Sequence, residues 1–257
     1  MNDSKYSRAH MESEIFEVDV VKLDIEGLSE KELKSTVKSN SAANYLVTQC
    51  EANDNKKINL LETMGFRVAG FPAVLTVNLH NFSNKFEKKI KEKKAIYTGF
   101  GMSKEKITIR PYVKTDLEEI KKIARGAFKS AHWYSTNVSM KKIDDFYVKW
   151  AENSCKGRAV IVLVAEQKGK VLGFNAVNLS NDKKSAQIDL IAVAPEARGK
   201  GIGKFLVAES LDWAKSNKLE EMKVKTEVIN YPAINIYLGQ GFKLVWLGVN
   251  MNKENNL

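Results

Sequence analysis

A short run of glycines and basic residues constrains this chain more than any other feature. Residues 198–203 read Arg-Gly-Lys-Gly-Ile-Gly, and they follow an apolar stretch, residues 188–193, that is rich in β-branched side chains. Such a stretch predicts a β-strand, and Pro195 ends it because proline has no amide hydrogen for a ladder. Residues 202–217 carry apolar side chains on two helical stripes, which predicts a helix that packs on two sides. The expected unit is strand, glycine loop and helix.

The chemistry of such a unit is the capture of an anion. Gly199, Gly201 and Gly203 have no Cβ, so backbone amides can approach a phosphate closely. The free N–H groups and the positive dipole end of the new helix complete the cradle, and Arg198 and Lys200 add charge. The spacing matches neither G-x-x-x-x-G-K-[ST] nor G-x-G-x-x-G. Taken alone, the loop is explained equally well as a glycine-rich turn without a ligand.

A second motif begins 27 residues after the last of these glycines (230 − 203). Residues 230–242 read N-Y-P-A-I-N-I-Y-L-G-Q-G-F, with Asn230, Ala233 and Tyr237 at fixed spacings before the final Gly-Phe. R-x-x-G-x-G after a strand, followed by N-x-x-A-x-x-x-Y-x-x-x-G-F, closely resembles the GNAT superfamily of N-acetyltransferases. The resemblance implies a GNAT fold of the α/β (α+β) class with a central mixed sheet.

The resemblance also implies acetyl-coenzyme A as cosubstrate and no metal. Tyr237 is expected to protonate the leaving thiolate, since a phenol with an ordinary pKa of ~10 is an adequate acid beside it; a tyrosine packed in the core is the alternative. By analogy alone, a backbone amide near residues 192–194 would polarise the carbonyl. Asn230 would contact the pantetheine arm or cap the next helix. The expected cofactor-binding residues are Ile191, Ala192, Val193, Arg198, Gly199, Lys200, Gly201, Ile202, Gly203, Asn230, Ala233 and Tyr237.

Residues 128–154 sharpen the resemblance through F-x-x-S, an aromatic loop and Y-x-x-W-x-x-N-S. This segment is similar to the TDP-fucosamine acetyltransferases, which acetylate the 4-amino group of a TDP-linked 4-amino-4,6-dideoxygalactose. The implied acceptor is a nucleotide-linked amino-dideoxy sugar of cell-surface polysaccharide biosynthesis, whose neutral amine attacks the thioester directly. Neither a histidine nor an aspartate is assigned as the base, because a water relay would serve equally well. The expected acceptor-binding residues are His132, Trp133, Tyr134 and Asp189.

The first hundred residues have no glycine loop, yet they repeat the element order of the C-terminal end. Strand, helix, Gly-Phe and strand occur in that order within residues 44–79 and again within residues 222–250. Leu61 occupies the position that Tyr237 has in the second copy. We therefore expect a partial, non-catalytic echo of the acetyltransferase fold. Coincidence is the alternative, because helix–glycine–strand is a common pattern.

The expected division is a smaller partial GNAT-like domain with its linker at residues 1–100 and the catalytic domain at residues 101–257. The connection is lysine-rich and could hold a helix at residues 84–94. Local patterns predict several further elements. These are a capping box at Ser29 and Glu32, a helix at residues 117–128 capped by Thr115-Asp116, a helix at residues 143–152 and a hairpin at residues 160–179.

Composition limits the classes of partner. The net charge of +10 suits phosphorylated ligands, but the lysines are spread widely and no nucleic-acid motif accompanies them, so a solvated surface is the simpler reading. Cys50 and Cys155 predict neither a disulfide framework nor a metal site. No apolar run is long enough to span a bilayer and no signal peptide is recognisable, so we expect a cytoplasmic protein.

Three alternatives stay open at this point. The acceptor could be another amine, such as a protein N-terminus or a polyamine, although a polyamine site should be acidic. The chain could bind acyl-coenzyme A without catalysis. RNA or ribosome binding through the basic surface is the third. We expect a nucleotide sugar and acetyl-coenzyme A as partners, neither nucleic acid nor membrane, and leave room for a homodimer.

Overall fold

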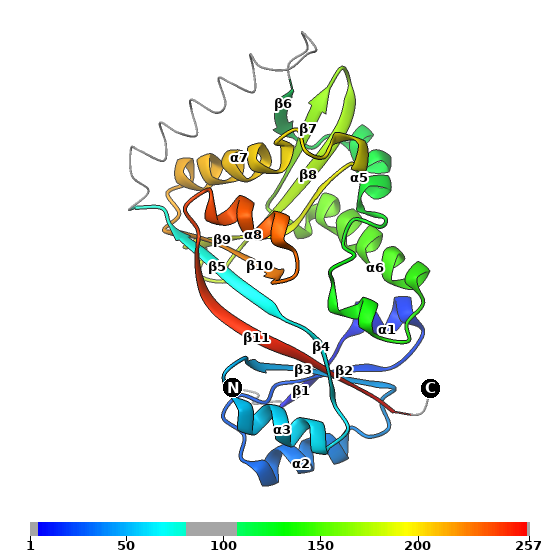
Figure 1. Ribbon diagram of the computed structural model, residues 1–257. Helices are drawn as coiled ribbons and strands as arrows, with labels where there is room; N and C mark the ends of the chain where they lie inside the picture. Colours follow the sequence, from blue (N-terminus) through cyan, green and yellow to red (C-terminus); the bar gives the residue numbers. More distant parts are fainter. Residues whose placement is uncertain (1–4, 81–106, 256–257) are drawn as a thin grey trace.

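One twisted, mixed sheet runs through the whole molecule (Figure 1). The computed structural model describes residues 5–80 and 107–255. Its 11 strands follow the order β1-β2-β3-β11-β5-β10-β9-β8-β7-β6, with β4 beside β11. The helix predicted at residues 84–94 lies outside the described residues.

The N-terminal half forms one end of this sheet and is built by short elements. The capping box predicted at Ser29 and Glu32 is confirmed, with both reciprocal hydrogen bonds present at the start of α2. The core lies between this end of the sheet and α2 and α3. In order, the elements are β1 (Tyr6–Arg8), α1 (His10–Phe16), β2 (Val20–Leu23), α2 (Glu30–Ser39), β3 (Tyr45–Glu51), α3 (Asn55–Thr63), β4 (Arg67–Gly70) and β5 (Pro72–Asn78).

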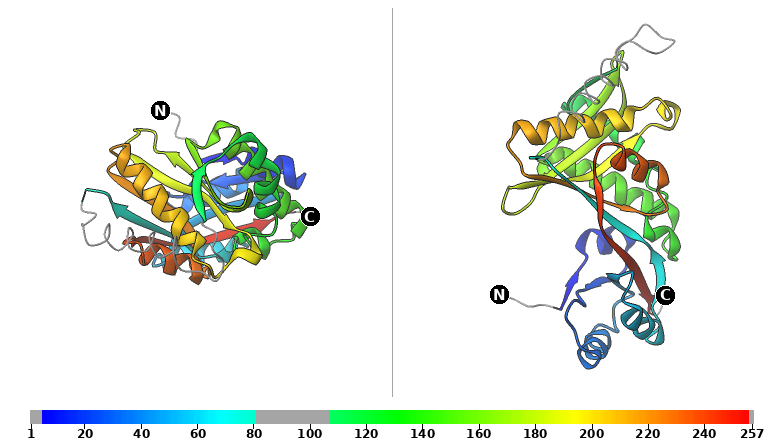
Figure 2. Two further views of the ribbon diagram at one scale, coloured as in Figure 1. Left: turned by 90° about the horizontal axis from the view of Figure 1, so that it is seen from above. Right: turned by 60° about the vertical axis from the view of Figure 1, so that its left-hand side comes forward.

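The C-terminal half has helices on both faces of the sheet. Helices α7 and α8 cover one face, and α5 and α6 cover the other (Figures 1 and 2). The elements are β6 (Thr108–Pro111), η1 (Lys114–Asp116), α5 (Leu117–Ala124), η2 (His132–Ser135), α6 (Met140–Asn153), η3 (Ser154–Arg158), β7 (Ile161–Gln167), β8 (Lys170–Leu179), β9 (Ser185–Val193), η4 (Pro195–Ala197), α7 (Ile202–Ser216), β10 (Glu221–Glu227), α8 (Tyr231–Leu238) and β11 (Lys243–Glu254). This is the GNAT fold that the motifs imply.

The two halves exchange their last strands. Strand β5 pairs antiparallel with β10 along its full length, from Pro72 opposite Glu227 to Asn78 opposite Glu221. The end of β11 pairs antiparallel with β3, and its beginning pairs with β5. The last strand of the first hundred residues therefore lies within the sheet of the C-terminal half, and the last strand of the chain completes the sheet of the N-terminal half.

The predicted strand at residues 188–193 and the predicted helix at residues 202–217 correspond to β9 and α7. One helix is shorter than predicted. Helix α5 ends at Ala124, because its C-cap leaves the helical region and Gly126 has a φ of +71°. Asp116 is the N-cap residue of α5, at the predicted Thr115-Asp116, but its side chain makes no capping hydrogen bond to the helix, since its carboxylate binds Arg110 at 2.7 and 2.9 Å.

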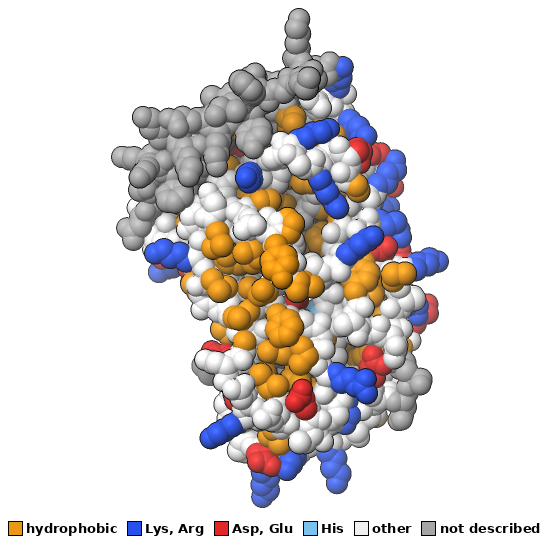
Figure 3. All heavy atoms as spheres, viewed as in Figure 1, with side chains coloured by type: hydrophobic (Ala, Val, Ile, Leu, Met, Phe, Trp, Pro, Cys, Tyr) orange, Lys and Arg blue, Asp and Glu red, His pale blue; other side chains and the backbone are white. Residues whose placement is uncertain are grey.

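Apolar side chains gather over α8 and β11 on the face that Figure 3 displays. Residues 243–247 of β11 pair with β5 on one side, whereas residues 248–254 have β3 on the other side. The exposed apolar residues of these two elements are Tyr231, Leu238, Leu244, Val245 and Leu247.

Candidate functional site

The glycine loop connects β9 to α7 and leaves the first turn of the helix without a side-chain cap. Gly199 and Gly201 both have a φ of +76°, a conformation that costs other residues about 1–2 kcal/mol. Gly201 is the N-cap of α7 and has no side chain that could accept a hydrogen bond from the free N–H groups that follow. The Arg198 Nε donates to the Val193 carbonyl at 3.2 Å and orients the loop. Lys200 and Ile202, which are also among the predicted cofactor-binding residues, lie on either side of Gly201. The arrangement suits an anion at the start of α7.

The structure brings the two sequence motifs together at Gly203. A Cβ on this glycine would lie 3.1 Å from the Ile236 Cδ1 and 3.9 Å from the Val193 Cγ2. The Gln240 Nε2 donates to the Lys204 carbonyl at 2.6 Å, which fastens the end of α8 to the first turn of α7. Glycine at position 203 therefore lets the second motif pack directly against the loop.

Strands β9 and β10 separate halfway along their length. Their parallel pairing runs from Ser185 opposite Glu221 to Ile188 opposite Val224, although both strands continue beyond it. The Ala194 N–H donates to the Leu172 carbonyl of β8 at 2.9 Å, so this amide is not available to a thioester.

The alternation of an antiparallel ladder fixes the direction of the amides that precede Ala194. It turns the Ala192 N–H toward β8 and directs the Ile191 and Val193 N–H groups to the side where β9 and β10 separate. Of the predicted 192–194 segment, Val193 is therefore the residue whose amide can face an acyl group.

Helix α8 holds the predicted proton donor in the core. The Asn230 side chain caps the helix by accepting from the Ala233 N–H at 3.4 Å. Tyr237 is 3% exposed, and its ring lies 5.5 Å from that of Phe242. Burial raises the pKa of Tyr237, so the phenol is protonated at neutral pH. The position suits a group that gives a proton, and its catalytic role stays a prediction.

Asp189 lies on the opposite face of the sheet, toward α6, and is already engaged. The Trp150 Nε1 donates to the Asp189 Oδ2 at 2.8 Å, and the Arg158 Nε lies 3.9 Å from the same oxygen. The Arg158 guanidinium also lies 5.1 Å from the centre of the Trp150 ring. A carboxylate with these partners is better suited to holding α6 and η3 than to accepting a proton.

The three predicted residues of the aromatic loop have separate surroundings in η2. Trp133 is 2% exposed and packs edge-on against Phe16 at 5.0 Å, so its ring has no free face for a substrate; the expected pocket role does not fit. The Tyr134 hydroxyl donates to the Asp144 Oδ1 at 2.7 Å. His132 is half-buried; burial, with the charges of Lys225 and Lys22, lowers its pKa to about 4. His132 is therefore neutral at physiological pH.

A group of residues that the motifs do not mark lies beside His132. A Cβ on Gly70 would lie 2.9 Å from the Glu227 Oε2 and 3.1 Å from the His132 Cβ. Glu227 ends β10, beyond the point where β9 and β10 separate. The available signal was the alternation in β10, where Met222 and Val224 are buried and Lys225 and Glu227 point to the other face.

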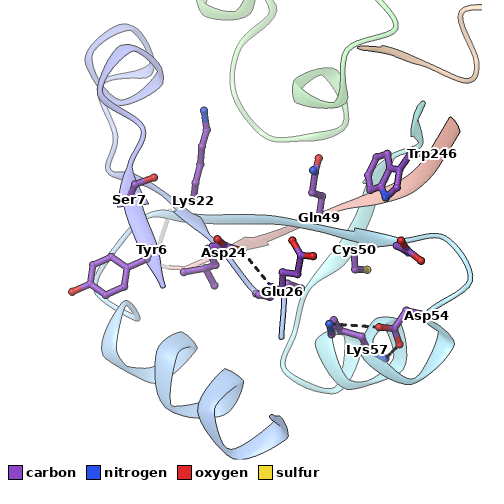
Figure 4. Close-up of a pocket in the computed structure, with 13 residues that line it drawn as sticks. Tyr6, Ser7, Lys22, Asp24, Glu26, Gln49, Cys50, Asp54, Lys57 and Trp246 are labelled. Atoms are coloured by element: carbon purple, nitrogen blue, oxygen red, sulfur yellow. Dashed lines mark hydrogen bonds and ion pairs between the residues drawn. The ribbon is translucent and has the colours of Figure 1, made fainter. Parts of the chain in front are cut away.

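The N-terminal half contains a cavity of about 650 Å³ at the ends of β2 and β3 (Figure 4). Asp54 caps α3 there, as Asn230 caps α8, but its carboxylate lies 3.5 Å from the Lys57 Nζ. The loop before α2 has one glycine and carries Asp24 and Glu26, which both line the cavity. Their negative charge disfavours a phosphate beside this loop, which therefore lacks the features of the glycine loop before α7.

The described parts of the chain are residues 5–80 and 107–255. Within them, no three His, Cys, Asp or Glu side chains are grouped closely enough to hold a metal ion. No helix in these ranges combines the length and apolar character that crossing a membrane requires.

Sequence comparison relates about half of the chain to known acetyltransferases. The spore coat polysaccharide biosynthesis protein SpsD of Bacillus subtilis is 31% identical over 128 residues, which cover 49% of this chain and 44% of SpsD. The dTDP-fucosamine acetyltransferase of Escherichia coli O6:H1 is 26% identical over 134 residues, covering 50% of this chain and 55% of that protein. The chain thus spans about half the length of these relatives.

Structural comparison extends the likeness of the fold to both halves. A GCN5-related N-acetyltransferase from Sphaerobacter thermophilus superposes with a TM-score of 0.63 at 13% identity, covering 98% of this chain and 76% of the other. The model of the acetyltransferase (GNAT) family matches residues 121–242, which contain the glycine loop, the separating strands and α8. The chain therefore carries an acetyltransferase domain of the GNAT family.

Proposed function

We propose that this chain is an N-acetyltransferase that uses acetyl-coenzyme A. The observation that carries the proposal is the contact at Gly203, where the glycine loop and the Tyr237 helix meet beside the separated strands. The GNAT family uses acetyl-coenzyme A, and the residues present suit its parts. The uncapped amides of the α7 first turn, with Arg198 and Lys200, suit the diphosphate. The free edge of β9 suits the pantetheine arm and the thioester.

In the proposed reaction, Tyr237 and the groups near the acceptor amine lie on opposite faces of the sheet. Tyr237, on the α7–α8 side, gives its proton to the departing sulfur. The Val193 N–H, directed away from β8, donates a hydrogen bond to the carbonyl oxygen as negative charge develops on it. The acceptor amine approaches from the α6 side, where Glu227 and His132 lie.

The acceptor in this proposal is a nucleotide-linked amino-dideoxy sugar, as in the TDP-fucosamine acetyltransferases. The names of the two relatives support this class, and so does the surface that leads to Glu227. Figure 4 shows Lys22 and Gln49 on the same side of β2 and β3. The Lys225 Nζ donates to the Gln49 Oε1 at 2.6 Å and lies 6.0 Å from the centre of the Trp246 ring. The Lys22 Nζ is paired with the Glu12 Oε1 at 2.6 Å, so the Lys225 ammonium and the Trp246 indole are the groups that suit a phosphate with an attached base.

Turnover with a panel of amines tests the proposal. Release of the free thiol from acetyl-coenzyme A is followed with TDP-4-amino-4,6-dideoxygalactose, a peptide with a free N-terminus, and spermidine. The proposal predicts turnover with the sugar nucleotide and at most background rates with the other two amines. Turnover of the peptide alone would reject the sugar acceptor but keep the acetyltransferase, whereas binding of acetyl-coenzyme A without any turnover would favour a non-catalytic module.

A further inference from the structure

We infer that Glu227 is the group that takes the proton from the ammonium form of the acceptor. This inference rests on the proposed acetyltransferase function and deepens it, since neither Asp189 nor His132 was assigned as the base. Its basis is the placement of the Glu227 carboxylate beyond the point where β9 and β10 separate, held by two neutral donors and packed against Gly70 and His132.

The position of Glu227 places its carboxylate on the acceptor side of the sheet. Glu227 lies three residues past Val224, the last residue of β10 that pairs with β9. Because side chains alternate along a strand, Glu227 points away from Val224, which packs with α7 and α8. The charge of Glu227 also acts on Tyr147, a residue of α6. The carboxylate is therefore on the same face as Asp189 and α6.

Two neutral donors hold the carboxylate, one on each oxygen. The Phe71 N–H donates to the Glu227 Oε2 at 2.8 Å, and the Asn250 Nδ2 donates to the Oε1 at 3.1 Å. These bonds fix the orientation of the carboxylate without the charge of an ion pair. Burial outweighs them and the attraction of Lys225, and it raises the pKa of Glu227 above its ordinary 4.5. A carboxylate in this state is a stronger base than one in water.

Gly70 packs directly against this carboxylate. A Cβ at this position would lie 2.9 Å from the Glu227 Oε2, closer than the two atoms can approach. The same Cβ would lie 3.1 Å from the His132 Cβ, so the backbone at Gly70 lies against both side chains. A side chain at position 70 would have to displace the Glu227 carboxylate or His132.

The other titratable groups around Glu227 are less suited to the task. Asp189 accepts from the Trp150 indole and faces Arg158. Burial and the charges of Lys225 and Lys22 lower the pKa of His132 to about 4, which makes it a weaker base than an ordinary imidazole. The remaining charged or titratable groups that act on this cluster are Lys225 of β10, Lys22 of β2, Glu12 of α1, and Tyr134 and Tyr147 on the α6 side.

The proton balance of the reaction closes with Glu227 as the acceptor of one proton. The ammonium gives a proton to the carboxylate, and the neutral nitrogen attacks the thioester carbon as the carbonyl electron pair moves to oxygen. On collapse the carbon–sulfur bond breaks and sulfur takes the proton of Tyr237. The second proton of the nitrogen restores the phenol, and Glu227 returns its proton to water. The net products are the amide, the free thiol and one proton.

The test compares Glu227→Gln with Glu221→Gln, a change at the other end of the same strand. We expect Glu227→Gln to lower kcat/KM for TDP-4-amino-4,6-dideoxygalactose by about 10²–10⁴-fold, with acetyl-coenzyme A affinity within about twofold of the wild type and the acid limb of the pH profile lost. Glu221→Gln should leave all three unchanged. A Glu227→Gln enzyme with the wild-type rate and pH profile would overturn the inference.

A second measurement does not depend on turnover and separates the inference from the proposed function. Carboxyl ¹³C shifts of glutamate-labelled protein are titrated with coenzyme A bound, and Glu227→Gln identifies the resonance. A Glu227 that titrates above 4.5 supports the inference, and one that titrates at or below 4.5 overturns it even if the sugar is acetylated. Absence of turnover with all three amines would instead reject the proposed function.

Discussion

Among the candidate site residues, Tyr237 is the one whose role the sequence motifs predict most specifically. Its hydroxyl is enclosed in the core, and burial alone raises its pKa. Because only the chemical step needs the phenol proton, we expect Tyr237→Phe to lower kcat at least 10-fold while leaving the Kd of acetyl-coenzyme A within about twofold. Tyr231→Phe is the control, since Tyr231 lies on the same helix and is 66% exposed. Equal kcat in both variants would remove Tyr237 from the mechanism.

A substitution at Gly199 separates the ligand-binding role of the glycine loop from its effect on the stability of the fold. A Cβ there meets no atom within 4 Å, and the same is true of Gly27, which also has a positive φ. Alanine at either position strains the backbone by about 1–2 kcal/mol. We expect both variants to lose similar stability in urea, but only Gly199→Ala to weaken acetyl-coenzyme A binding in calorimetry. Equal binding by the two variants would contradict the role of the loop.

Local motifs reveal the donor side of the site but not the acceptor side. Gly203 and Tyr237 belong to patterns within 40 residues of one another, and their spacing encodes strand, loop and helix. Glu227 meets Phe71 across 156 residues of sequence, through the insertion of β5 beside β10. No local pattern predicts that contact. For the same reason the burial of Trp133 against Phe16 was not foreseen.

At the scale of elements, an ion-pair network closes the edge of the sheet. Arg110 of β6 binds Asp116 with two nitrogens and contacts Glu166 of β7 at 2.7 Å. The hydrogen bonds from Arg110 lower the pKa of Asp116. This network explains why the Asp116 side chain makes no capping hydrogen bond to α5.

The Asp116 network predicts a pH-dependent stability. A carboxyl whose folded pKa is lowered stabilises the fold above its unfolded pKa of ~3.9, and this contribution is lost as the pH falls through the folded value. We expect Asp116→Asn to reduce the free energy of unfolding by about 1–3 kcal/mol at pH 7. The difference from the wild type should shrink below about pH 4 in urea titrations. A difference that stays constant over this range would contradict the assignment.

At the scale of the whole molecule, strand exchange joins the two halves. Met251 of β11 is fully buried in the N-terminal core although it lies near the end of the chain. The repeated order of strand, helix and Gly-Phe is visible in the sequence, but the exchange of partners is not, since either pairing satisfies the same local pattern. The division at residue 100 stays a prediction.

The exchange predicts that the two halves unfold together. Cys50, buried in the N-terminal core, reports on one half through its thiol reactivity. With Trp133 and Trp246 replaced by Phe, the fluorescence of Trp150 and Trp213 reports on the other half. On a Cys155→Ser background, we expect Met251→Ala to cost about 2–5 kcal/mol and to shift both urea transitions equally. If Cys50 became reactive well before the fluorescence changed, the halves would be independent.

The central claim is that this chain has a single site for acetyl-coenzyme A, formed by the loop that opens α7. The loop before α2, which lines the N-terminal cavity, carries Asp24 and Glu26, so this cavity should not bind the same ligand. Isothermal calorimetry of the wild-type chain with acetyl-coenzyme A tests this most directly. We predict saturable heat with one molecule bound per chain; no detectable binding, or two molecules per chain, would contradict the account.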